Sequence, residues 1–264
     1  MELYKELKNC NDFFLIAGPC VIEDEKMMMS VTAKLVEMTE KRGIKFIFKS
    51  SFRKANRTSV GSPTGPGLIE GLKILSKIKK EFNIPILTDI HDVSEVKKVA
   101  VVADILQIPA FLSRQSDLIS EAAKTGKIVN IKKGQFMAPE DMESAAEKVQ
   151  VEKNNKILLT ERGTSFGYHN LIVDFRSFAI MSQFGYPVIY DVTHSLQKPS
   201  QNKTSGGTPQ YALKMAKAAL ATGDVKGLFI ETHPNPALAL SDANSMLPID
   251  ELPQLLDACL KIER

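Results

Sequence analysis

The sequence is poor in cysteine, and the few cysteines are widely spaced. The chain has three cysteines, which is an odd number, and they lie far apart in the sequence: Cys10, Cys20 and Cys259. A disulfide framework needs paired cysteines and an oxidising compartment, so we expect three separate thiols in a reducing one. The sequence also lacks any Cys-x-x-Cys or His-x-x-x-His pair. A compact local zinc motif is therefore excluded.

Long hydrophobic runs and a strong charge of one sign are also missing. No apolar stretch approaches the roughly 18 residues of a membrane span, and residues 1–6 lack the basic-then-apolar order of a signal peptide. The formal net charge is only +3 over 264 residues. Composition thus favours neither a nucleic-acid partner nor a membrane partner. We expect a cytoplasmic protein.

What the sequence contains is a regular alternation of two kinds of segment. Short apolar runs are separated by amphipathic stretches of helical period that are rich in Lys and Glu, which is typical of βα units. The expected strands are Phe13 to Ala17, Phe46 to Ser50, Pro85 to Asp89, Ile105 to Ile108, Ile128 to Lys132, Ile157 to Glu161, Val188 to Asp191 and Leu228 to Glu231. The expected helices are Asp24 to Lys41, Gly67 to Glu81, Val93 to Val101, Arg114 to Lys124, Ala138 to Val149, Leu171 to Gln183, Pro209 to Ala221 and Ile249 to Ile262.

Eight such units predict a (β/α)₈ TIM barrel that occupies residues 1–264 as a single domain, because this fold takes about 250 residues. The nearly continuous apolar runs fit strands that are buried on both faces. An open doubly wound sheet is the alternative, but no Gly-x-Gly-x-x-Gly fingerprint follows the first strand. The loop Gln197 to Pro209 is rich in Ser, Gly, Lys and Asn, and we expect it to be mobile.

Polar residues close nearly every expected strand, and in such a barrel the active site forms at those ends. Six cations are expected at or near this rim: Lys49, Lys54, Arg57, Arg114, Lys132 and Arg162. They would repel one another unless an anion lies between them, which predicts phosphate or carboxylate ligands. The alternative is a set of solvated surface charges. The run Lys54 to Ser59 combines two cations, two hydroxyls and an amide, which suits a phosphate cradle.

Four more residues at or just beyond strand ends suit a divalent metal: Cys20, His194, Glu231 and Asp242. A thiolate, an imidazole and two carboxylates fit an ion of borderline softness such as Zn²⁺, Fe²⁺ or Mn²⁺. Taken singly, Cys20 favours a small buried thiol over a metal ligand, and His194 favours a hydrogen-bonding or catalytic imidazole. Their shared place at the rim favours the joint reading. His91 and His233 are either substrate contacts or structural histidines.

Together these motifs resemble the 3-deoxy-D-manno-octulosonate 8-phosphate synthase family, which condenses phosphoenolpyruvate with arabinose 5-phosphate. The resemblance covers nearly the whole chain. It is carried by Ala17-Gly18-Pro19-Cys20, Phe48-Lys49-Ser50-Ser51-Phe52, Lys54-Ala55-Asn56-Arg57, Gln107-Ile108-Pro109-Ala110-Phe111-Leu112, Thr160-Glu161-Arg162-Gly163, Phe166-Gly167-Tyr168 and Leu240-Ser241-Asp242-Ala243. Several long motifs in order are far more specific than any one of them.

The resemblance implies a role for each matching residue. Lys49, Lys132, Arg162 and the backbone of Ala110 match the phosphate site for phosphoenolpyruvate, with Lys54 and Ser51 near its carboxylate. The residues expected in catalysis are Lys49, Lys54, Asp89, Lys132, His194 and Asp242. Those expected to bind substrate are Ser51, Asn56, Arg57, Thr58, Gln107, Ala110, Arg114 and Arg162. In the family Arg57 and Thr58 grip the sugar phosphate from a neighbouring subunit, which implies a homotetramer.

Cys20 places the chain with the metal-dependent branch of that family, because the metal-independent branch has Asn there. His169 departs from the family, where Asn or Asp is expected. The nearest alternative is 3-deoxy-D-arabino-heptulosonate 7-phosphate synthase, which typically has Lys-Pro-Arg-Thr where this chain has Lys54 to Thr58. A Schiff-base aldolase would instead use Lys49 or Lys132 as its nucleophile. A non-catalytic sugar-phosphate binding protein would have no use for the metal set.

Overall fold

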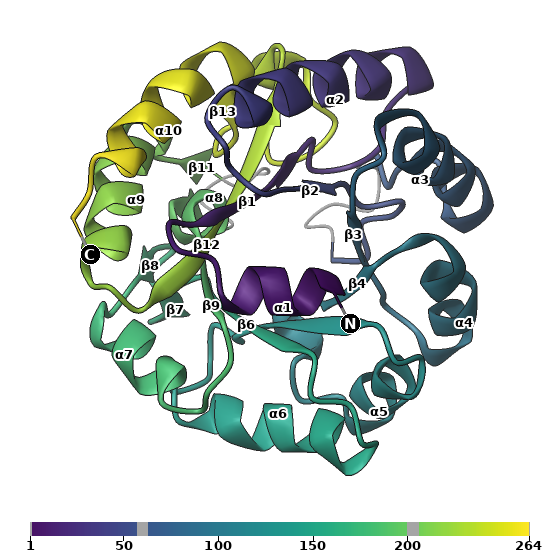
Figure 1. The fold of residues 1–264 in the computed structure, drawn as a ribbon, viewed down its shortest axis with the longest axis vertical. Helices are drawn as coiled ribbons and strands as arrows, with labels where there is room; N and C mark the ends of the chain where they lie inside the picture. Colours follow the sequence, from purple (N-terminus) through teal and green to yellow (C-terminus); the bar gives the residue numbers. More distant parts are fainter. Residues whose placement is uncertain (1, 57–62, 200–205, 264) are drawn as a thin grey trace.

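The fold is a closed ring of parallel strands. The computed structural model describes residues 2–56, 63–199 and 206–263. The barrel strands are β1 (Phe14–Gly18), β2 (Phe46–Lys49), β3 (Ile86–Asp89), β4 (Ile105–Ile108), β5 (Ile128–Lys132), β6 (Ile157–Glu161), β9 (Val188–Asp191) and β12 (Val225–His233). They pair in this order, and β12 pairs with β1 to close the ring (Figure 1). The predicted TIM barrel is confirmed, and the closure excludes an open sheet.

A ring of helices surrounds the barrel (Figure 1). Its members are α2 (Glu25–Glu40), α3 (Leu68–Phe82), α4 (Val93–Val102), α5 (Ser116–Lys124), α6 (Asp141–Val151), α7 (Arg176–Ser182), α9 (Ala212–Ala221) and α10 (Leu252–Leu260). Aspartates begin two of them, because a carboxylate satisfies a backbone N–H group at the first turn. The side chain of Asp24 accepts a hydrogen bond from the backbone N–H of Met27, and that of Asp92 accepts one from Ser94.

The strands divide the core into two layers. Leu15 and Ala17 of β1 face the helices, while Phe14 and Ile16 face the barrel interior. This alternation follows from the two-residue period of a strand. The interior layer also contains Ile47, Leu87, Ile105, Ile128, Leu158, Ile189 and Phe229. Both faces of each strand are therefore buried, as the continuous apolar runs predicted.

A short helix that the sequence analysis did not predict closes the amino-terminal end of the barrel. This helix, α1 (Glu2–Lys8), lies across the ring of strands (Figure 1). Leu7 is fully buried in the interior layer, and the Tyr4 hydroxyl donates a hydrogen bond to the carbonyl oxygen of Ile157 (3.2 Å). Seven residues carry too little periodicity to indicate a helix from sequence. Its packing leaves the carboxyl ends of the strands as the open end.

Two predicted segments differ from the structure. The expected helix Leu171 to Gln183 begins only at Arg176, because β8 (Leu171–Ile172) pairs antiparallel with β7 (Thr164–Ser165). Within the expected mobile loop, β10 (Gln197–Lys198) pairs with β11 (Gly206–Gly207), and residues 200–205 lie outside the described part of the chain. Over the described residues, no helix is long and apolar enough to cross a membrane.

The remaining elements are short and lie mostly beyond strand ends. They are η1 (Ala110–Leu112), α8 (Val192–Ser195), η2 (Pro209–Tyr211), η3 (Pro236–Leu238), β13 (Leu247–Pro248) and η4 (Ile249–Glu251). The 3₁₀ turns η2 and η4 replace the first turn of two predicted helices. Both follow or contain proline, which is common where a helix begins because the first N–H groups have no partner within the helix.

Candidate active site

A cavity opens at the carboxyl ends of the strands and gathers most of the predicted site. Its predicted lining residues are Lys49, Lys54, Asn56, Asp89, Gln107, Ala110, Lys132, Arg162 and His194. Four further residues complete the lining: His91, Pro109, Phe111 and Gln135. These side chains come from six of the barrel strands and the loops that follow them. The expectation that the polar residues at the strand ends meet is therefore correct.

Two of the predicted substrate residues that the structure describes, Ser51 and Arg114, do not line this cavity. Arg114 is exposed, and its backbone carbonyl accepts a hydrogen bond from the ammonium of Lys148 (3.0 Å). Arg57 and Thr58 lie outside the described residues.

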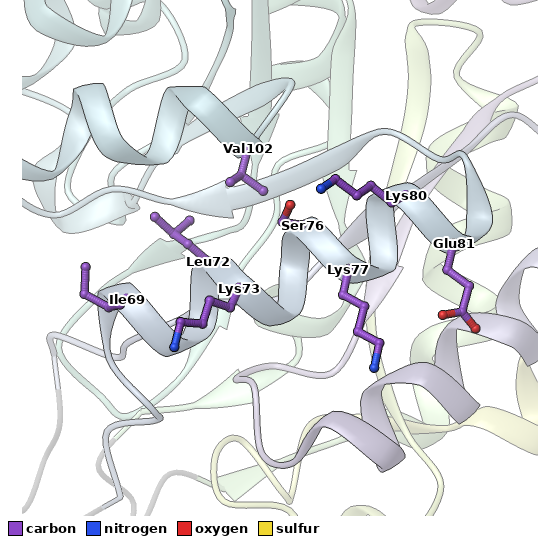
Figure 2. A pocket seen from close by; sticks show the side chains of 8 residues that line it. All are labelled: Ile69, Leu72, Lys73, Ser76, Lys77, Lys80, Glu81 and Val102. Atoms are coloured by element: carbon purple, nitrogen blue, oxygen red, sulfur yellow. The ribbon is translucent and has the colours of Figure 1, made fainter.

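A second hollow lies on the outside of the barrel and contains none of the predicted site residues. It runs along α3, where Leu72 and Val102 point toward each other and the ammonium groups of Lys73 and Lys77 point outward (Figure 2). None of its lining residues is a strand-end residue. The strand-end cavity is therefore the candidate active site.

Carboxylates inside the barrel neutralise the lysines of the cavity. The ammonium of Lys49 donates a hydrogen bond to Glu231, and Lys54 lies 3.9 Å from the same carboxylate. The ammonium of Lys132 is 2.6 Å from Asp191 and 3.8 Å from the centre of the Phe229 ring. These buried carboxylates offset part of the repulsion that the sequence analysis expected among the cations, although burial, together with Lys49, still lowers the pKa of Lys132.

Arg162 differs from the lysines because part of its guanidinium has no partner. Its Nη2 donates to the side-chain oxygen of Gln197 (3.2 Å), whereas its Nη1 is buried without a hydrogen-bond partner among the described residues. Burial lowers the pKa of Arg162, although the nearby Asp191 and Asp242 oppose this effect. A guanidinium in this state is suited to bind an incoming phosphate or carboxylate.

Asp191 organises the centre of the site, and the sequence analysis assigned it no role. It is fully buried and lies close to both Lys132 (2.6 Å) and the Nδ1 atom of His194 (2.8 Å). Burial alone would raise the pKa of Asp191, but His194 and Lys132 hold it far below its usual range. Its position as the last residue of β9 was the available signal.

The contact with Asp191 also sets the direction of the His194 ring. An aspartate carboxylate accepts hydrogen bonds, so Nδ1 of His194 is the donor and Nε2 is the ring nitrogen left to make another contact. That Nε2 atom faces the Oε2 atom of Glu231 at 3.6 Å. A carboxylate behind one ring nitrogen is the usual support for a histidine whose other nitrogen binds a metal.

Three of the four predicted metal ligands lie together. One ligand atom each from Cys20, Glu231 and Asp242 lie within 4.8 Å of one another, and His194 lies beside this group rather than in it. The Cys20 thiol donates to Asp242 (2.7 Å), and the Oε2 atom of Glu231 is buried without a hydrogen-bond partner among the described residues. Burial and the two carboxylates raise the pKa of the Cys20 thiol well above its usual value. A bound cation would reverse this effect, because it favours the thiolate.

The backbone holds these ligands through two unusual positions. A Cβ atom on Gly18 would lie only 2.1 Å from the carbonyl oxygen of Lys49, so this close approach of β1 and β2 requires glycine. Asp242 has a φ of 53°, in the left-handed region that aspartate tolerates better than most residues. Its Oδ1 atom accepts from Gln197 (2.7 Å), which also contacts Arg162. Gln197 thus connects the guanidinium of Arg162 to the candidate metal ligands.

Buried hydrogen bonds across four neighbouring strands support the floor of the cavity. Thr160 donates to Asn130 (2.7 Å), and Asn130 donates to the side-chain oxygen of Gln107 (2.9 Å). The Gln107 amide and the Ser51 hydroxyl both donate to Asp89. Burial would raise the pKa of Asp89, but the charges of Lys49 and Lys54 lower it. Ser51 therefore acts on the cavity through Asp89.

Similarity in sequence places this barrel in a known family. A family model described as the DAHP synthetase I family matches residues 8–263, and the chain belongs to that family. The 2-dehydro-3-deoxyphosphooctonate aldolase of Fusobacterium nucleatum is 51% identical over 253 residues, which cover 96% of this chain and 91% of the relative. The protein of the same name from Trichlorobacter lovleyi is 52% identical over 243 residues, covering 92% and 89%. The one from Xanthomonas campestris is 50% identical over 251 residues, covering 95% and 91%. The resemblance that the sequence motifs indicated is confirmed.

Proposed function

We propose that this protein condenses phosphoenolpyruvate with D-arabinose 5-phosphate and water to give 3-deoxy-D-manno-octulosonate 8-phosphate and phosphate. The product supplies a core sugar of lipopolysaccharide. The observation that carries the proposal is the identity of about 50% over nearly the whole chain with proteins named 2-dehydro-3-deoxyphosphooctonate aldolase. The strand-end cavity supports the same activity, because both substrates are phosphorylated anions and the Nη1 atom of Arg162 has no partner among the described residues.

The reaction asks the cavity to hold two anions close together. C3 of phosphoenolpyruvate forms a bond to the aldehyde carbon of the sugar, water adds to C2, and phosphate leaves with cleavage of the C–O bond. Arg162 and Lys132 are the groups that would bind and orient the phosphate, with Lys49 beside them. Holding both reactants in one geometry can lower such a barrier by about 7 to 11 kcal/mol. Positioning is therefore a large part of the proposed catalysis.

We propose in addition that Cys20, His194, Glu231 and Asp242 hold a divalent metal ion, either Zn²⁺, Fe²⁺ or Mn²⁺. The buried, unpartnered oxygen of Glu231 supports this proposal, as does the direction of the His194 ring. The mixed sulfur, nitrogen and oxygen donors suit an ion of this class. Such an ion, when bound, polarises a carbonyl oxygen or lowers the pKa of a coordinated water.

Quaternary structure and location are proposed from the same family relationship. We propose a homotetramer, in which a neighbouring subunit completes the sugar-phosphate side of the site. Large aromatic side chains on the loops beyond β5 and β6 support an interface there, since Phe136, Phe166 and Tyr168 are 60%, 64% and 85% exposed. We propose a cytoplasmic location, because highly charged sugar phosphates do not cross membranes unaided. Analytical ultracentrifugation of the full chain tests the tetramer.

Product analysis with two acceptor sugars tests the activity. The purified protein is incubated with phosphoenolpyruvate and either arabinose 5-phosphate or erythrose 4-phosphate, and products are identified by mass spectrometry alongside phosphate release. An eight-carbon product from the five-carbon sugar is expected. A seven-carbon product formed faster from erythrose 4-phosphate would instead establish the heptulosonate synthase, which the family description keeps as the specific alternative. Absence of product with either sugar would overturn both.

One observation favours a Schiff-base aldolase as a second candidate. Burial lowers the pKa of Lys132, as expected of a lysine nucleophile, although Asp191 opposes the shift. The carboxylate at 2.6 Å favours the ammonium form, which cannot attack a carbonyl. Borohydride reduction in the presence of substrate distinguishes the two mechanisms, because only a Schiff base leaves a covalent adduct on Lys132 or Lys49.

A further inference from the structure

A further buried ion pair lies directly behind the phosphate-binding side chains. The residues next to Lys132 and Arg162 in sequence are Lys133 and Glu161, which are 0% and 1% exposed. Successive side chains of a strand point to opposite faces. Lys132 and Arg162 accordingly line the cavity, whereas Lys133 and Glu161 do not. The ammonium of Lys133 lies 3.5 Å from the Oε1 atom of Glu161.

The pair holds the backbone on both sides of Arg162. The Oε1 atom of Glu161 accepts a hydrogen bond from the backbone N–H of Gly163 (2.6 Å), so the glutamate bridges the arginine between them. Gly163 has a φ of 92°, a conformation that favours glycine and turns the chain sharply after the arginine. Lys133 donates to the hydroxyl of Thr164 (3.1 Å) and so fixes the next residue.

Lys133 also fixes the loop after its own strand. Its ammonium donates to the carbonyl oxygen of Met137 (3.1 Å), which closes the turn that contains Gln135, a lining residue of the cavity. The carbonyl of Gln135 in turn accepts from the backbone N–H of Ser165 (2.9 Å). The loops after β5 and β6 are thus joined by a side-chain link and a backbone link.

Stability alone does not account for this pair. Removing two charges from water is costly, and well-packed apolar residues often replace a buried ion pair without loss of stability. Burial lowers the pKa of Lys133 even though Glu161 opposes the shift, so it is energetically unfavourable to keep this lysine charged inside the fold. Every contact described above ends on the backbone or side chains of the two loops that flank the phosphate-binding residues.

We propose that Lys133 and Glu161 are positioning residues for the phosphate of phosphoenolpyruvate. They set the direction of the Arg162 side chain and the shape of the adjoining loops, and they do not touch the substrate. This inference rests on the proposed function, because it assigns the phosphate to Arg162 and Lys132. It predicts that loss of the pair weakens phosphoenolpyruvate binding selectively, while binding of arabinose 5-phosphate and the turnover rate at saturation change little.

The test is a double substitution that removes both charges, Lys133→Met with Glu161→Gln. The glutamine oxygen can still accept from Gly163, and no unpaired buried charge remains, so the urea midpoint should stay close to that of the wild type. The KM and the calorimetric Kd for phosphoenolpyruvate should rise by about tenfold, since small misplacements of binding groups have large effects. The KM for arabinose 5-phosphate and the kcat should stay within about twofold of the wild type. Glu161→Gln alone should give an intermediate rise.

A matched control uses an ion pair at the opposite end of the barrel. Lys79 lies 2.7 Å from Asp104 and also donates to a carbonyl oxygen, that of Val102 (2.9 Å). Lys79→Met with Asp104→Asn should leave the KM for phosphoenolpyruvate unchanged, whatever it does to the urea midpoint.

Three outcomes would overturn the positioning role. The first is an unchanged Kd for phosphoenolpyruvate in the Lys133 and Glu161 double variant, and the second is an equal rise in the KM of both substrates together with a lower urea midpoint. The third is a similar loss of phosphoenolpyruvate affinity in the control. If the wild type binds phosphoenolpyruvate but forms no product, the proposed function fails, while the Kd comparison still decides the role of the pair.

Discussion

Replacing Arg162 by methionine should stabilise the free protein while it weakens phosphoenolpyruvate binding. Arg162 is 5% exposed, its Nη1 atom has no partner among the described residues, and its recorded hydrogen bond to Gln197 is long at 3.2 Å. Burial lowers its pKa in spite of nearby carboxylates, so the folded protein disfavours the charged guanidinium. Methionine fills similar space and removes that charge.

The size of both effects follows from these contacts. A buried polar group without a partner costs about 1 to 3 kcal/mol, and the lost bond to Gln197 is worth about 0.5 to 1.5 kcal/mol. The free energy of unfolding of Arg162→Met should therefore rise by about 1 kcal/mol. A hydrogen bond to a charged group contributes about 1.5 to 3 kcal/mol, so losing even one weakens phosphoenolpyruvate binding by at least about tenfold.

Urea unfolding of the metal-free protein and calorimetric titration with phosphoenolpyruvate measure the two effects. Arg42 provides the control, because its guanidinium makes two bonds to Asp257 (2.7 and 2.9 Å) that raise its pKa. Arg42→Met should therefore be neutral or slightly destabilising and should leave substrate affinity unchanged. A less stable Arg162→Met protein that binds phosphoenolpyruvate as tightly as the wild type would refute the reasoning.

Three further predictions concern the metal, the response to acid and the strand contact. Cys20→Ser should lose bound metal by elemental analysis together with most activity, and full activity in the metal-stripped variant would exclude a metal role. The charges of Lys49 and Lys54 outweigh burial and lower the pKa of Asp89 in the folded protein. The ionised Asp89 therefore contributes fully to the free energy of unfolding above about pH 4, and this contribution is lost as the pH falls through the folded-state pKa. The difference in urea midpoint between wild type and Asp89→Asn should shrink from pH 6 to pH 3, and a constant difference would contradict this. Gly18→Ala should cost at least about 1 to 3 kcal/mol of unfolding free energy, because its Cβ would overlap the Lys49 carbonyl oxygen; an unchanged urea midpoint would contradict the overlap.

The barrel was predictable because its strands have a strong local signature. The expected strands from Ile105 to Ile108, Ile128 to Lys132, Ile157 to Glu161 and Val188 to Asp191 have the observed bounds. Strands buried on both faces give continuous apolar runs, and these are visible without any knowledge of the fold. The β7–β8 hairpin was not predictable, because two-residue strands have no period. Its pairing depends on the turn after Arg162, which is a tertiary feature.

The sequence predicted which residues form the site but not which of them lie next to one another. Strand ends identify which residues meet at the rim, and Lys49, Lys132 and Arg162 indeed meet there. The sequence does not say which carboxylate lies next to which cation, because partners such as Asp191 and Lys132 are 59 residues apart. The carboxylates that offset the repulsion among the cations were therefore not predicted. The assignment of Cys20 as a metal ligand stays a prediction, supported by the carboxylates around it.

The helix α1 across the amino-terminal end of the barrel has a practical consequence for handling the protein. Its buried Leu7 and the Tyr4 hydrogen bond fasten the start of the chain to the end of the barrel that is remote from the cavity. An affinity tag or surface attachment joined ahead of α1 would therefore leave the mouth of the cavity facing solution. Removal of α1 itself would be harmful, because it would expose the apolar interior layer of the barrel to water.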